Sequence, residues 1–401
     1  MPGCLAWVYL PARRPPPTPW RPGSPRLRAI CASPGRIFPL SGLKKMKICF
    51  LAGTLGQGGA ERQLFYQVSA LQRVGALPFI VAFAQDEFWE GRLKALGIPV
   101  YALPVQSRQL KRLWFAAKII RRERPVVIQA AHFYVNLYAW LLARLLGSRE
   151  VGAVRSNGFQ DVSEMGRWSG RGSLLFPRIL AVNSRAGLDN LEKMGRTRQS
   201  MVYLPNAVDA ERFFPADQAP ADAQRLIMVG RMSEPKRFDL FLRIVAELNG
   251  QGLPVMGHLV GDGPLRPALE RLALDLGLGP DRARFHGAVE NAEVLFRQAR
   301  LCLHISDWEG MPNTALEAMA CGLPVIASRV GGLAELIQDE KTGYLISPGD
   351  FEDLLASVVR LIRDEGLRRS MGRQAREYVL KQHDLSMLPD RLLEIYRAAG
   401  A

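Results

Sequence analysis

The sequence has few of the residues that build metal and disulfide sites. Its 401 residues include five cysteines and five histidines, and the histidines are scattered singly. Cys4 and Cys31 lie in the first 45 residues, while Cys49, Cys302 and Cys321 stand in apolar surroundings without CxxC spacing. We expect small buried thiols in a reducing compartment, and no pattern is typical of a disulfide framework or a structural zinc.

Long apolar runs are also missing. No stretch of about 18 residues is free of charges and helix breakers, so the sequence predicts no membrane-spanning helix. The longest apolar segment, FYVNLYAWLLARLL (133–146), is interrupted by Asn136 and Arg144 and is typical of a buried helix.

Acidic residues are absent from the first 45 residues, which carry eight Lys/Arg and ten of the 27 prolines. Such a composition cannot form a core. Its apolar run CLAWVYL precedes the arginines, unlike a secretory signal, and a transit peptide is a less favoured alternative. We expect residues 1–45 to be a tail or an upstream-extended start, and the folded protein to begin near Met46. The other 356 residues keep only +7 of the +15 net charge, which argues against nucleic-acid binding.

From Met46 onwards, short β-rich runs alternate with longer helical patterns. Continuous apolar strands separated by amphipathic helices indicate parallel sheets covered on both faces. The segment 208–224, rich in Pro, Ala and Asp, is the best linker candidate, and the alternation restarts after it. We predict an α/β protein with two Rossmann-like, doubly wound parallel-sheet domains that face a central cleft. The predicted strands are 47–53, 78–84, 99–105, 125–132, 151–156, 179–184, 201–206, 225–231, 254–263, 283–289, 301–306, 324–328 and 343–347.

Several loops after predicted strands have a composition suited to phosphate. GTLGQGGAE (53–61) opens a helix, although it matches neither the P-loop nor GxGxxG. In VGRMSEPKR (229–237), Arg231 and Lys236 follow a strand, and two cations there suit a diphosphate. LVGDGPL (259–265) and SRVGGLAELI (328–337) are further glycine-containing strand ends, and each of these loops is also consistent with a plain turn.

The segment EGMPNTALE (309–317) places two glutamates at a strand–loop–helix junction. Pro312 and Asn313 mark the helix entry, so Glu317 falls in its first turns and Glu309 in the loop before it. The amides of roughly residues 314–316 then point out of a helix start that carries about half a positive charge. This arrangement favours a phosphate site over the acid–base pair of a glycoside hydrolase.

Together these motifs resemble the retaining nucleotide-sugar glycosyltransferases of family four, which have the two-domain GT-B fold. The strongest element is EGMPNTALEAMACGLPVIASRVGGLAELI, and VGRMSEPKR, LVGDGPL, YLPNAVD and GGAERQ fall in the family's order. The resemblance covers nearly all of residues 46–401. It implies an N-terminal acceptor-side domain (46–215), a C-terminal nucleotide-sugar domain (216–380) and a terminal helix (381–401) that crosses back to the first domain.

The resemblance also implies roles for single residues. Arg231 and Lys236 correspond to the cations that stabilise the departing diphosphate, Glu309 to the glutamate beside the transferred sugar, and His132 to a histidine that reaches this sugar. Glu317 corresponds to the residue that binds the ribose hydroxyls. The other positions implied at the donor are Gly230, Gly261, His286, Ala288, Val289, Gly310, Met311, Asn313, Thr314, Ala315 and Leu316. The positions implied on the acceptor side are Gly58, Gly59, Arg155 and Asn157.

Three positions depart from the family pattern. Arg237 and Ala207 stand where glycine is frequent, and the strand before His132 lacks the acidic residue that often begins it. These changes bear on loop geometry and on the assignment of His132, and none removes a functional group.

The function implied is a retaining hexosyl transfer from a UDP- or GDP-sugar to a hydroxyl of a glycan or lipid-linked acceptor, in cell-surface polysaccharide or glycolipid synthesis. No cofactor and no metal is expected, and the nucleotide sugar is a substrate. We expect a cytoplasmic protein, with a peripheral contact between basic segment 108–122 and an anionic membrane as an added prediction. The alternatives are a catalytically silent GT-B module that binds a glycan or partner, and a nucleotide-dependent oxidoreductase, which lacks its GxGxxG motif.

Overall fold

The computed structural model describes residues 40–104, 109–216 and 224–401 of the chain. The N-terminal tail predicted for residues 1–45 and the middle of the predicted linker therefore lie largely outside the described residues. Within the described part, no helix is both long and apolar enough to cross a membrane.

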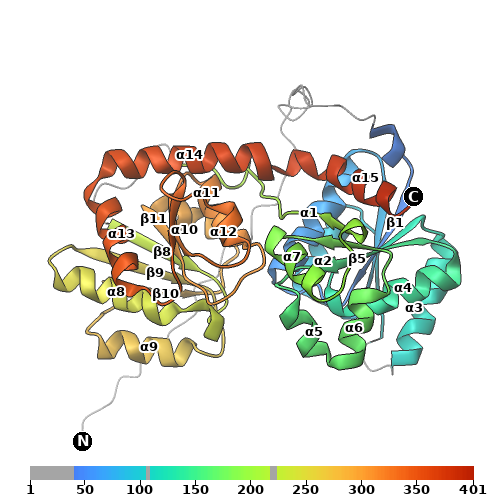
Figure 1. Ribbon diagram of the computed structural model, residues 1–401, viewed down its shortest axis with the longest axis horizontal. Helices are drawn as coiled ribbons and strands as arrows, with labels where there is room; N and C mark the ends of the chain where they lie inside the picture. The colour runs from blue at the N-terminus through green and yellow to red at the C-terminus, as the bar shows by residue number, and fades with distance from the viewer. Residues whose placement is uncertain (1–39, 105–108, 217–223) are drawn as a thin grey trace, which may run out of the picture. The chain divides into compact units, whose positions relative to one another are not determined.

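Two parallel sheets form the framework, and each predicted β-rich run forms a strand (Figure 1). The first sheet has seven strands in the order β3-β2-β1-β4-β5-β6-β7, and the second has six in the order β10-β9-β8-β11-β12-β13. The strands of the first are β1 (Lys47–Ala52), β2 (Leu77–Ala82), β3 (Val100–Ala102), β4 (Val127–Ala130), β5 (Arg149–Val154), β6 (Ile179–Val182) and β7 (Met201–Tyr203). Those of the second are β8 (Gln224–Val229), β9 (Val255–Val260), β10 (Ala283–Gly287), β11 (Leu301–His304), β12 (Val325–Ser328) and β13 (Gly343–Ile346). The doubly wound fold class predicted from the sequence is confirmed.

Helices connect the strands and cover both faces of each sheet (Figure 1). Around the first sheet lie α1 (Gly59–Arg73), α2 (Phe88–Ala95), α3 (Gln109–Glu123), α4 (Asn136–Leu146), α5 (Phe159–Met165), α6 (Arg167–Leu175) and α7 (Arg185–Lys193). Around the second lie α8 (Phe238–Gly250), α9 (Arg266–Asp275), α10 (Ala292–Gln298), α11 (Asn313–Ala320), α12 (Leu333–Leu336), α13 (Phe351–Arg363) and α14 (Glu365–His383), followed by α15 (Leu388–Ala398).

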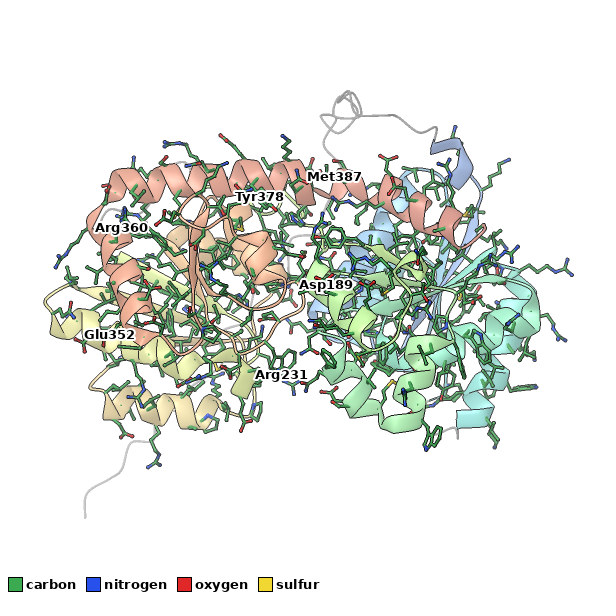
Figure 2. The ribbon with its side chains drawn as sticks, in the orientation of Figure 1. Asp189, Arg231, Glu352, Arg360, Tyr378 and Met387 are labelled. Atoms are coloured by element: carbon green, nitrogen blue, oxygen red, sulfur yellow. The ribbon has the colours of Figure 1, made fainter. Side chains whose placement is uncertain are left out.

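Successive side chains of each strand point to opposite faces of its sheet, and apolar side chains on both faces leave the sheet buried on both sides. In β1, Ile48 and Phe50 enter one apolar cluster, while Cys49 and Leu51 enter another on the opposite face. In β12, Ile326 and Ala327 are likewise divided between two clusters. The side chains drawn in Figure 2 occupy both faces of each sheet. Strands buried on both faces have no polar side, and this is why the sequence shows them as continuous apolar runs.

The end of the chain returns to the first sheet. Helix α14 packs against α11, while α15 packs against α1, and Tyr396 of α15 donates a hydrogen bond to Gln129 of β4 (2.7 Å). The predicted linker is partly buried, because Phe213 is fully enclosed in the second sheet's apolar cluster. The domain boundary at 215/216 stays a prediction, since it adjoins residues outside the described part.

Two crossings between the sheets run side by side within one compact unit, Pro39–Ala401. Val208 pairs with Asp384 in parallel, and its amide donates to the carbonyl of His383 (2.8 Å). The His383 ring in turn contacts the carbonyl of Asn206 through Nδ1 (2.9 Å). The segment after β7 and the segment between α14 and α15 are therefore joined by hydrogen bonds.

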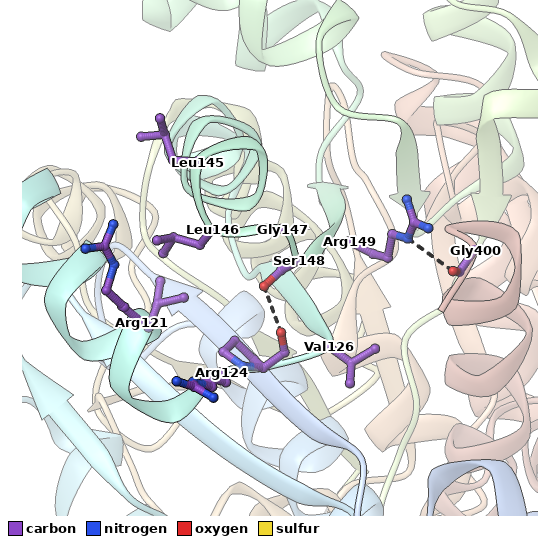
Figure 3. Close-up of a pocket in the computed structure, with 11 residues that line it drawn as sticks. Arg121, Arg124, Val126, Leu145, Leu146, Gly147, Ser148, Arg149 and Gly400 are labelled. Carbon is purple, nitrogen blue, oxygen red and sulfur yellow. Dashed lines mark hydrogen bonds between the residues drawn. The ribbon is translucent and has the colours of Figure 1, made fainter.

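A surface cavity of about 540 Å³ lies at the amino ends of β4 and β5 (Figure 3). Arg121, Arg124 and Arg149 line it together with Leu145, and no acidic residue is among its lining residues. Because β4 and β5 are parallel, this basic cavity and the loops that follow the strands lie at opposite edges of the first sheet.

Candidate functional site

In each sheet, the loops whose composition suits a phosphate lie at the topological switch point, where the strand order reverses direction. In the second sheet, the strand order reverses direction between β8 and β11, and Arg231 and Glu309 follow the carboxyl ends of these two strands. In the first sheet, the reversal lies between β1 and β4, which are followed by the Gly-rich loop 53–61 and by His132. Open parallel sheets bind their ligands at such points, because the loops on either side diverge there and leave a crevice.

Glycines hold the loops of the second sheet against one another. Gly261 has φ +129°, and a Cβ atom there would lie 1.9 Å from the carbonyl oxygen of Gly230. Gly331 has φ +47°, and its Cβ would lie 2.0 Å from the carbonyl oxygen of Glu309. Any other residue at these positions would force the loops apart, so the backbones of Gly230 and Gly261 lie in direct contact.

Glu309 is the centre of a buried polar cluster. Its Oε1 accepts hydrogen bonds from Nε2 of His304 (2.7 Å) and the Ser306 hydroxyl (2.9 Å), and it forms an ion pair with Lys236. Burial alone raises the pKa of the Glu309 carboxyl, but the charge of Lys236 and the His304 hydrogen bond outweigh burial and lower it to about 2. Glu309 is therefore ionised at neutral pH.

His304 was not identified from the sequence, although it ends the strand that leads to Glu309. Its Nδ1 contacts the Thr314 hydroxyl (3.2 Å), while Nε2 contacts Glu309. Burial and the neighbouring Lys236 lower the pKa of His304, so the ring is neutral with its proton on Nε2. The histidine thereby connects the loop glutamate to the first turn of α11.

The two basic residues of VGRMSEPKR differ in their surroundings. Lys236 is paired with Glu309, whereas Arg231 is exposed and its guanidinium has no partner among the described residues. Arg237, which replaces the usual glycine, forms a two-pronged pair with Asp239 (both contacts 3.0 Å) and a longer contact with Asp307. Arg237 is therefore paired with the start of its own helix. Arg231 has no such pairing and remains available to a ligand.

The start of helix α11 presents main-chain amides, but fewer than the sequence implied. An α-helix leaves its first N–H groups without an internal partner. Leu316 N–H already contacts the carbonyl of Pro312 (3.5 Å), so the amides of Asn313, Thr314 and Ala315 are those that a ligand can use. Met311 is buried and offers its carbonyl to Asn206 (2.7 Å) instead of facing solvent.

The Asn313 side chain joins the second sheet to the first. It donates to the carbonyl of Gly59 (2.9 Å) and accepts hydrogen bonds from Gln63 (3.0 Å) and Asn206 (2.8 Å). Because these contacts occupy the side-chain amide of Asn313, only the main chain of this residue remains available to a ligand. Gln63 also holds both the amide and the carbonyl of Ala207, the position where glycine is frequent.

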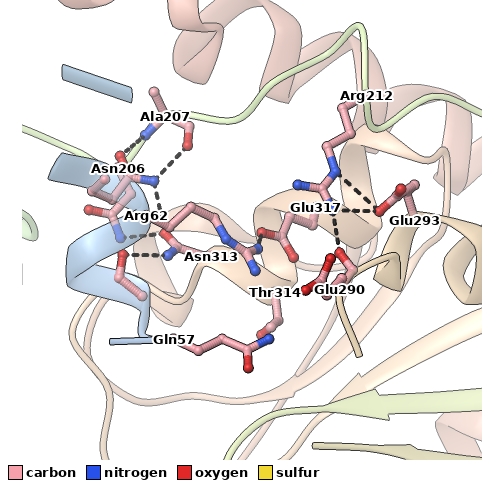
Figure 4. A network of polar contacts seen from close by, with 12 residues as sticks. Gln57, Arg62, Asn206, Ala207, Arg212, Glu290, Glu293, Asn313, Thr314 and Glu317 are labelled. Carbon is pink, nitrogen blue, oxygen red and sulfur yellow. Dashed lines mark hydrogen bonds and ion pairs between the residues drawn. The ribbon is translucent and has the colours of Figure 1, made fainter. Parts of the chain in front are cut away.

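Glu317 lies in the same network and is almost fully buried (Figure 4). Its Oε1 is paired with Arg62 of α1, while its Oε2 has no partner among the described residues. Arg62 was not identified from the sequence, because its contact with a residue 255 positions away depends on the arrangement of two separate sheets.

His132 is held by two contacts at the end of β4. The amide of Gly53 donates to Nδ1 (3.3 Å), and Nε2 contacts Glu61 (3.1 Å). A Cβ on Gly58 would lie 2.1 Å from the Glu61 carboxylate, so a larger residue there would displace this side chain. Glu61 is a third residue that sequence reasoning did not assign to the site.

The remaining predicted residues are placed less favourably for direct binding. The His286 ring is stacked on His258 and contacts it (2.8 Å), so its side chain is occupied while Ala288 is exposed. The carbonyl of Val289 accepts a contact from Gln57 (3.4 Å). The Asn157 side chain accepts from the amide of Gln160 at the start of α5 (2.9 Å), which is a structural role.

Gly310 and Gly59 lie where segments of the two sheets approach each other. A Cβ on Gly310 would lie 2.5 Å from the carbonyl oxygen of Arg155, and one on Gly59 would lie 3.0 Å from the Asn313 side chain. Among the residues that the structure describes, no group of three His, Cys, Asp or Glu side chains is placed to hold a metal ion.

Comparison with known sequences decides the family. The family described as "Glycosyl transferases group 1" matches residues 223–364, and "Glycosyl transferase 4-like domain" matches residues 58–207. The chain belongs to the family-four glycosyltransferases.

Curated relatives of this glycosyltransferase cover most of its length. It is 26% identical over 317 residues to N-acetyl-alpha-D-glucosaminyl L-malate synthase of Bacillus anthracis, covering 74% of this chain and 79% of that one. It is 25% identical over 353 residues to the lipopolysaccharide core biosynthesis glycosyltransferase LpsE of Rhizobium meliloti, covering 84% and 95%. The structure of Anabaena Alr3699/HepE in complex with UDP has a TM-score of 0.78 at 21% identity and covers 88% of this chain and all of that one, which confirms the GT-B fold.

The ionised state of Glu309 predicts a dependence of stability on pH. A carboxyl whose folded pKa lies below its ordinary value of 4.5 stabilises the fold above pH 4.5, and this contribution is lost as pH falls towards 2. We expect Glu309→Gln to lower the free energy of unfolding by roughly 1–3 kcal/mol near pH 7 and by almost nothing near pH 2. Urea unfolding at several pH values measures this difference.

Glu377→Gln is the matched control, because Glu377 is exposed on α14. Its difference from the wild type should stay small at every pH. A cost of Glu309→Gln that does not change between pH 7 and pH 2 would contradict the assigned charge state.

Proposed function

We propose that this glycosyltransferase moves a hexose from a UDP- or GDP-sugar to a hydroxyl of a glycan or lipid-linked acceptor, with retention of configuration at the anomeric carbon. The observation that carries the proposal is the grouping at the β8–β11 switch point. Arg231 and Lys236 follow β8 there, and the Glu309 carboxylate and the amides of α11 follow β11. A nucleoside diphosphate sugar has two negative phosphates joined to a neutral sugar, and this grouping matches both parts.

The cations and the helix start would hold the diphosphate. Arg231 offers a forked set of donors and Lys236 a point charge, while the amides at Asn313–Ala315 suit an anionic oxygen. As the bond between the sugar and the diphosphate breaks, negative charge develops on the leaving phosphate, and groups fixed in advance stabilise it. In this proposal protein cations supply that stabilisation, and the prediction that no metal is required stays a prediction.

Glu309 cannot act as a general acid at neutral pH, because the pKa of its carboxyl is lowered to about 2. A carboxylate there instead accepts hydrogen bonds from the sugar hydroxyls and stabilises positive charge that develops on the ring. His132, oriented by Gly53 and Glu61, would hold the sugar from the first sheet. Acceptor attack on the face that the diphosphate leaves gives retention, and a donor phosphate oxygen takes the acceptor proton.

Glu317 would bind the ribose through Oε2, the oxygen that Arg62 does not hold. The main chain at Gly287–Val289 would contact the base, since the His286 side chain is occupied by His258. The HepE structure contains UDP, and the two curated relatives are named for transfer in L-malate glycoside and lipopolysaccharide core synthesis. These names support a nucleotide-sugar donor and a glycan or small-molecule hydroxyl acceptor for this chain.

Arg231→Ala gives the sharpest test of the donor site, because Arg231 is exposed and makes no contact whose loss would unfold the protein. We expect turnover of UDP- or GDP-sugars to fall by about a hundredfold or more. Lys236→Ala should reduce it as far, with some loss of stability from its pair with Glu309. Nucleotide release across a panel of donors measures the rates, and calorimetric titration of UDP and GDP measures binding.

Arg243→Ala is the control, since Arg243 is exposed on α8 away from the strand ends. It should retain the wild-type rate and the wild-type melting temperature. Full turnover by Arg231→Ala and Lys236→Ala would overturn the diphosphate assignment.

We also propose that the transferase works in the cytoplasm and that its first sheet touches an anionic membrane through α3. The side chains of Leu110 and Trp114 are 81% and 59% exposed, and Lys118 lies over the Trp114 ring (5.6 Å). The same helix leads to Arg121 and the basic cavity of Figure 3, whose rim includes Leu145 at 62% exposure. Exposed apolar residues flanked by cations are typical of a helix that lies in a membrane interface.

Sedimentation with lipid vesicles tests this contact. The double variant Leu110→Ser and Trp114→Ser should bind phosphatidylglycerol vesicles about tenfold more weakly, because two apolar side chains no longer leave water. Leu274→Ser on α9, where the side chain is 72% exposed, is the control and should bind as the wild type does. Equal binding of all three proteins would contradict the proposal.

A further inference from the structure

Arg155 occupies a central place on the carboxyl edge of the first sheet. It directly follows β5, and the parallel pairing of Gln129 with Val151 places the end of β5 beside the end of β4, which leads to His132. The main chain of Arg155 is fixed, because its carbonyl accepts a hydrogen bond from Asn183 (3.0 Å). The same carbonyl lies against Gly310, the residue after Glu309.

The guanidinium of Arg155 is a half-buried cation without a counter-ion among the described residues. Its Nε and Nη1 atoms are buried, and neither has a hydrogen-bond partner there. Burial lowers the pKa of Arg155 to about 10, and no charged neighbour contributes to the shift. The guanidinium therefore remains charged at neutral pH.

The carboxylates at this edge already contact other groups. Asp161 accepts a hydrogen bond from the Ser156 hydroxyl (2.5 Å), Glu61 contacts His132, and Glu309 pairs with Lys236. An unpaired cation whose nitrogens leave water destabilises the fold, so a folded protein rarely keeps one without a binding role. Arg155 differs in this from the buried Arg196, whose guanidinium donates to several main-chain carbonyls.

We propose that Arg155 binds an anionic group of the acceptor, either a phosphate or a carboxylate, so that the acceptor substrate of this transferase is an acidic molecule. The inference rests on the proposed function, and it specifies the substrate class that the first sheet receives. The donor diphosphate already has Arg231, Lys236 and the start of α11 on the second sheet. Arg155 belongs to the first sheet beside His132, where an acceptor hydroxyl would approach the sugar.

Titration with small acids tests the proposal without knowledge of the natural acceptor. Glycerol 1-phosphate and glycerate probe the phosphate and carboxylate alternatives, and glycerol is the neutral reference, each added to the full-length protein with and without saturating UDP. We expect one of the acids to bind the wild type at least tenfold more tightly than glycerol. Arg155→Met should abolish that preference while it leaves the affinity for UDP within about twofold.

Thermal unfolding separates a binding role from a structural one. Arg155→Met removes an unpaired, half-buried charge, so the unliganded variant should melt at the wild-type temperature or above it. Arg149→Met is the matched control, because Arg149 is exposed at the other end of the same strand, and it should keep the preference for the acid.

Three results would overturn the proposal. One is a wild type that binds neither acid more tightly than glycerol, and another is an Arg155→Met protein that keeps the preference. The third is a loss of UDP affinity in Arg155→Met, which would assign the arginine to the donor. Failure of the wild type to bind UDP or GDP would instead count against the proposed function, and the titrations without UDP would still decide the role of Arg155.

Discussion

A buried carboxylate paired with an amine organises the second half of this protein. Glu309 stays ionised in an apolar setting because Lys236, His304 and Ser306 contact one of its oxygens. Lys236 belongs to the loop after β8, while the other residues belong to β11 and the loop after it, so the cluster ties two adjacent strand ends together. These contacts fix the carboxylate at the junction of the two strand ends.

The start of α11 extends this order to the first half of the chain. Thr314 contacts His304. The Asn313 side chain is hydrogen-bonded to Gly59 of the Gly-rich segment, to Gln63 of α1 and to Asn206 of the segment after β7. The amides that would meet a phosphate are therefore positioned by contacts to both sheets.

Much of this could be predicted from the sequence, for physical reasons. Strands buried on both faces are continuous apolar runs, so all thirteen strands were predicted. Gly261 and the Gly331–Gly332 pair, which close backbone contacts require, were also noted in the sequence. Partners from distant segments could not be predicted, because no local pattern links Arg62 to Glu317 or Glu61 to His132. The occupied side chains of Asn313 and His286 were missed for the same reason.

We propose that the grouping around Arg231, Lys236 and Glu309 transfers a hexose from a nucleoside diphosphate sugar with retention of configuration. Proton NMR of the sugar first released from an α-linked UDP- or GDP-hexose, with water as the acceptor, tests this mechanism. We expect the α-anomer to appear first and to convert slowly to the equilibrium mixture. Initial release of the β-anomer would contradict it, because the acceptor would then attack from the face opposite the diphosphate.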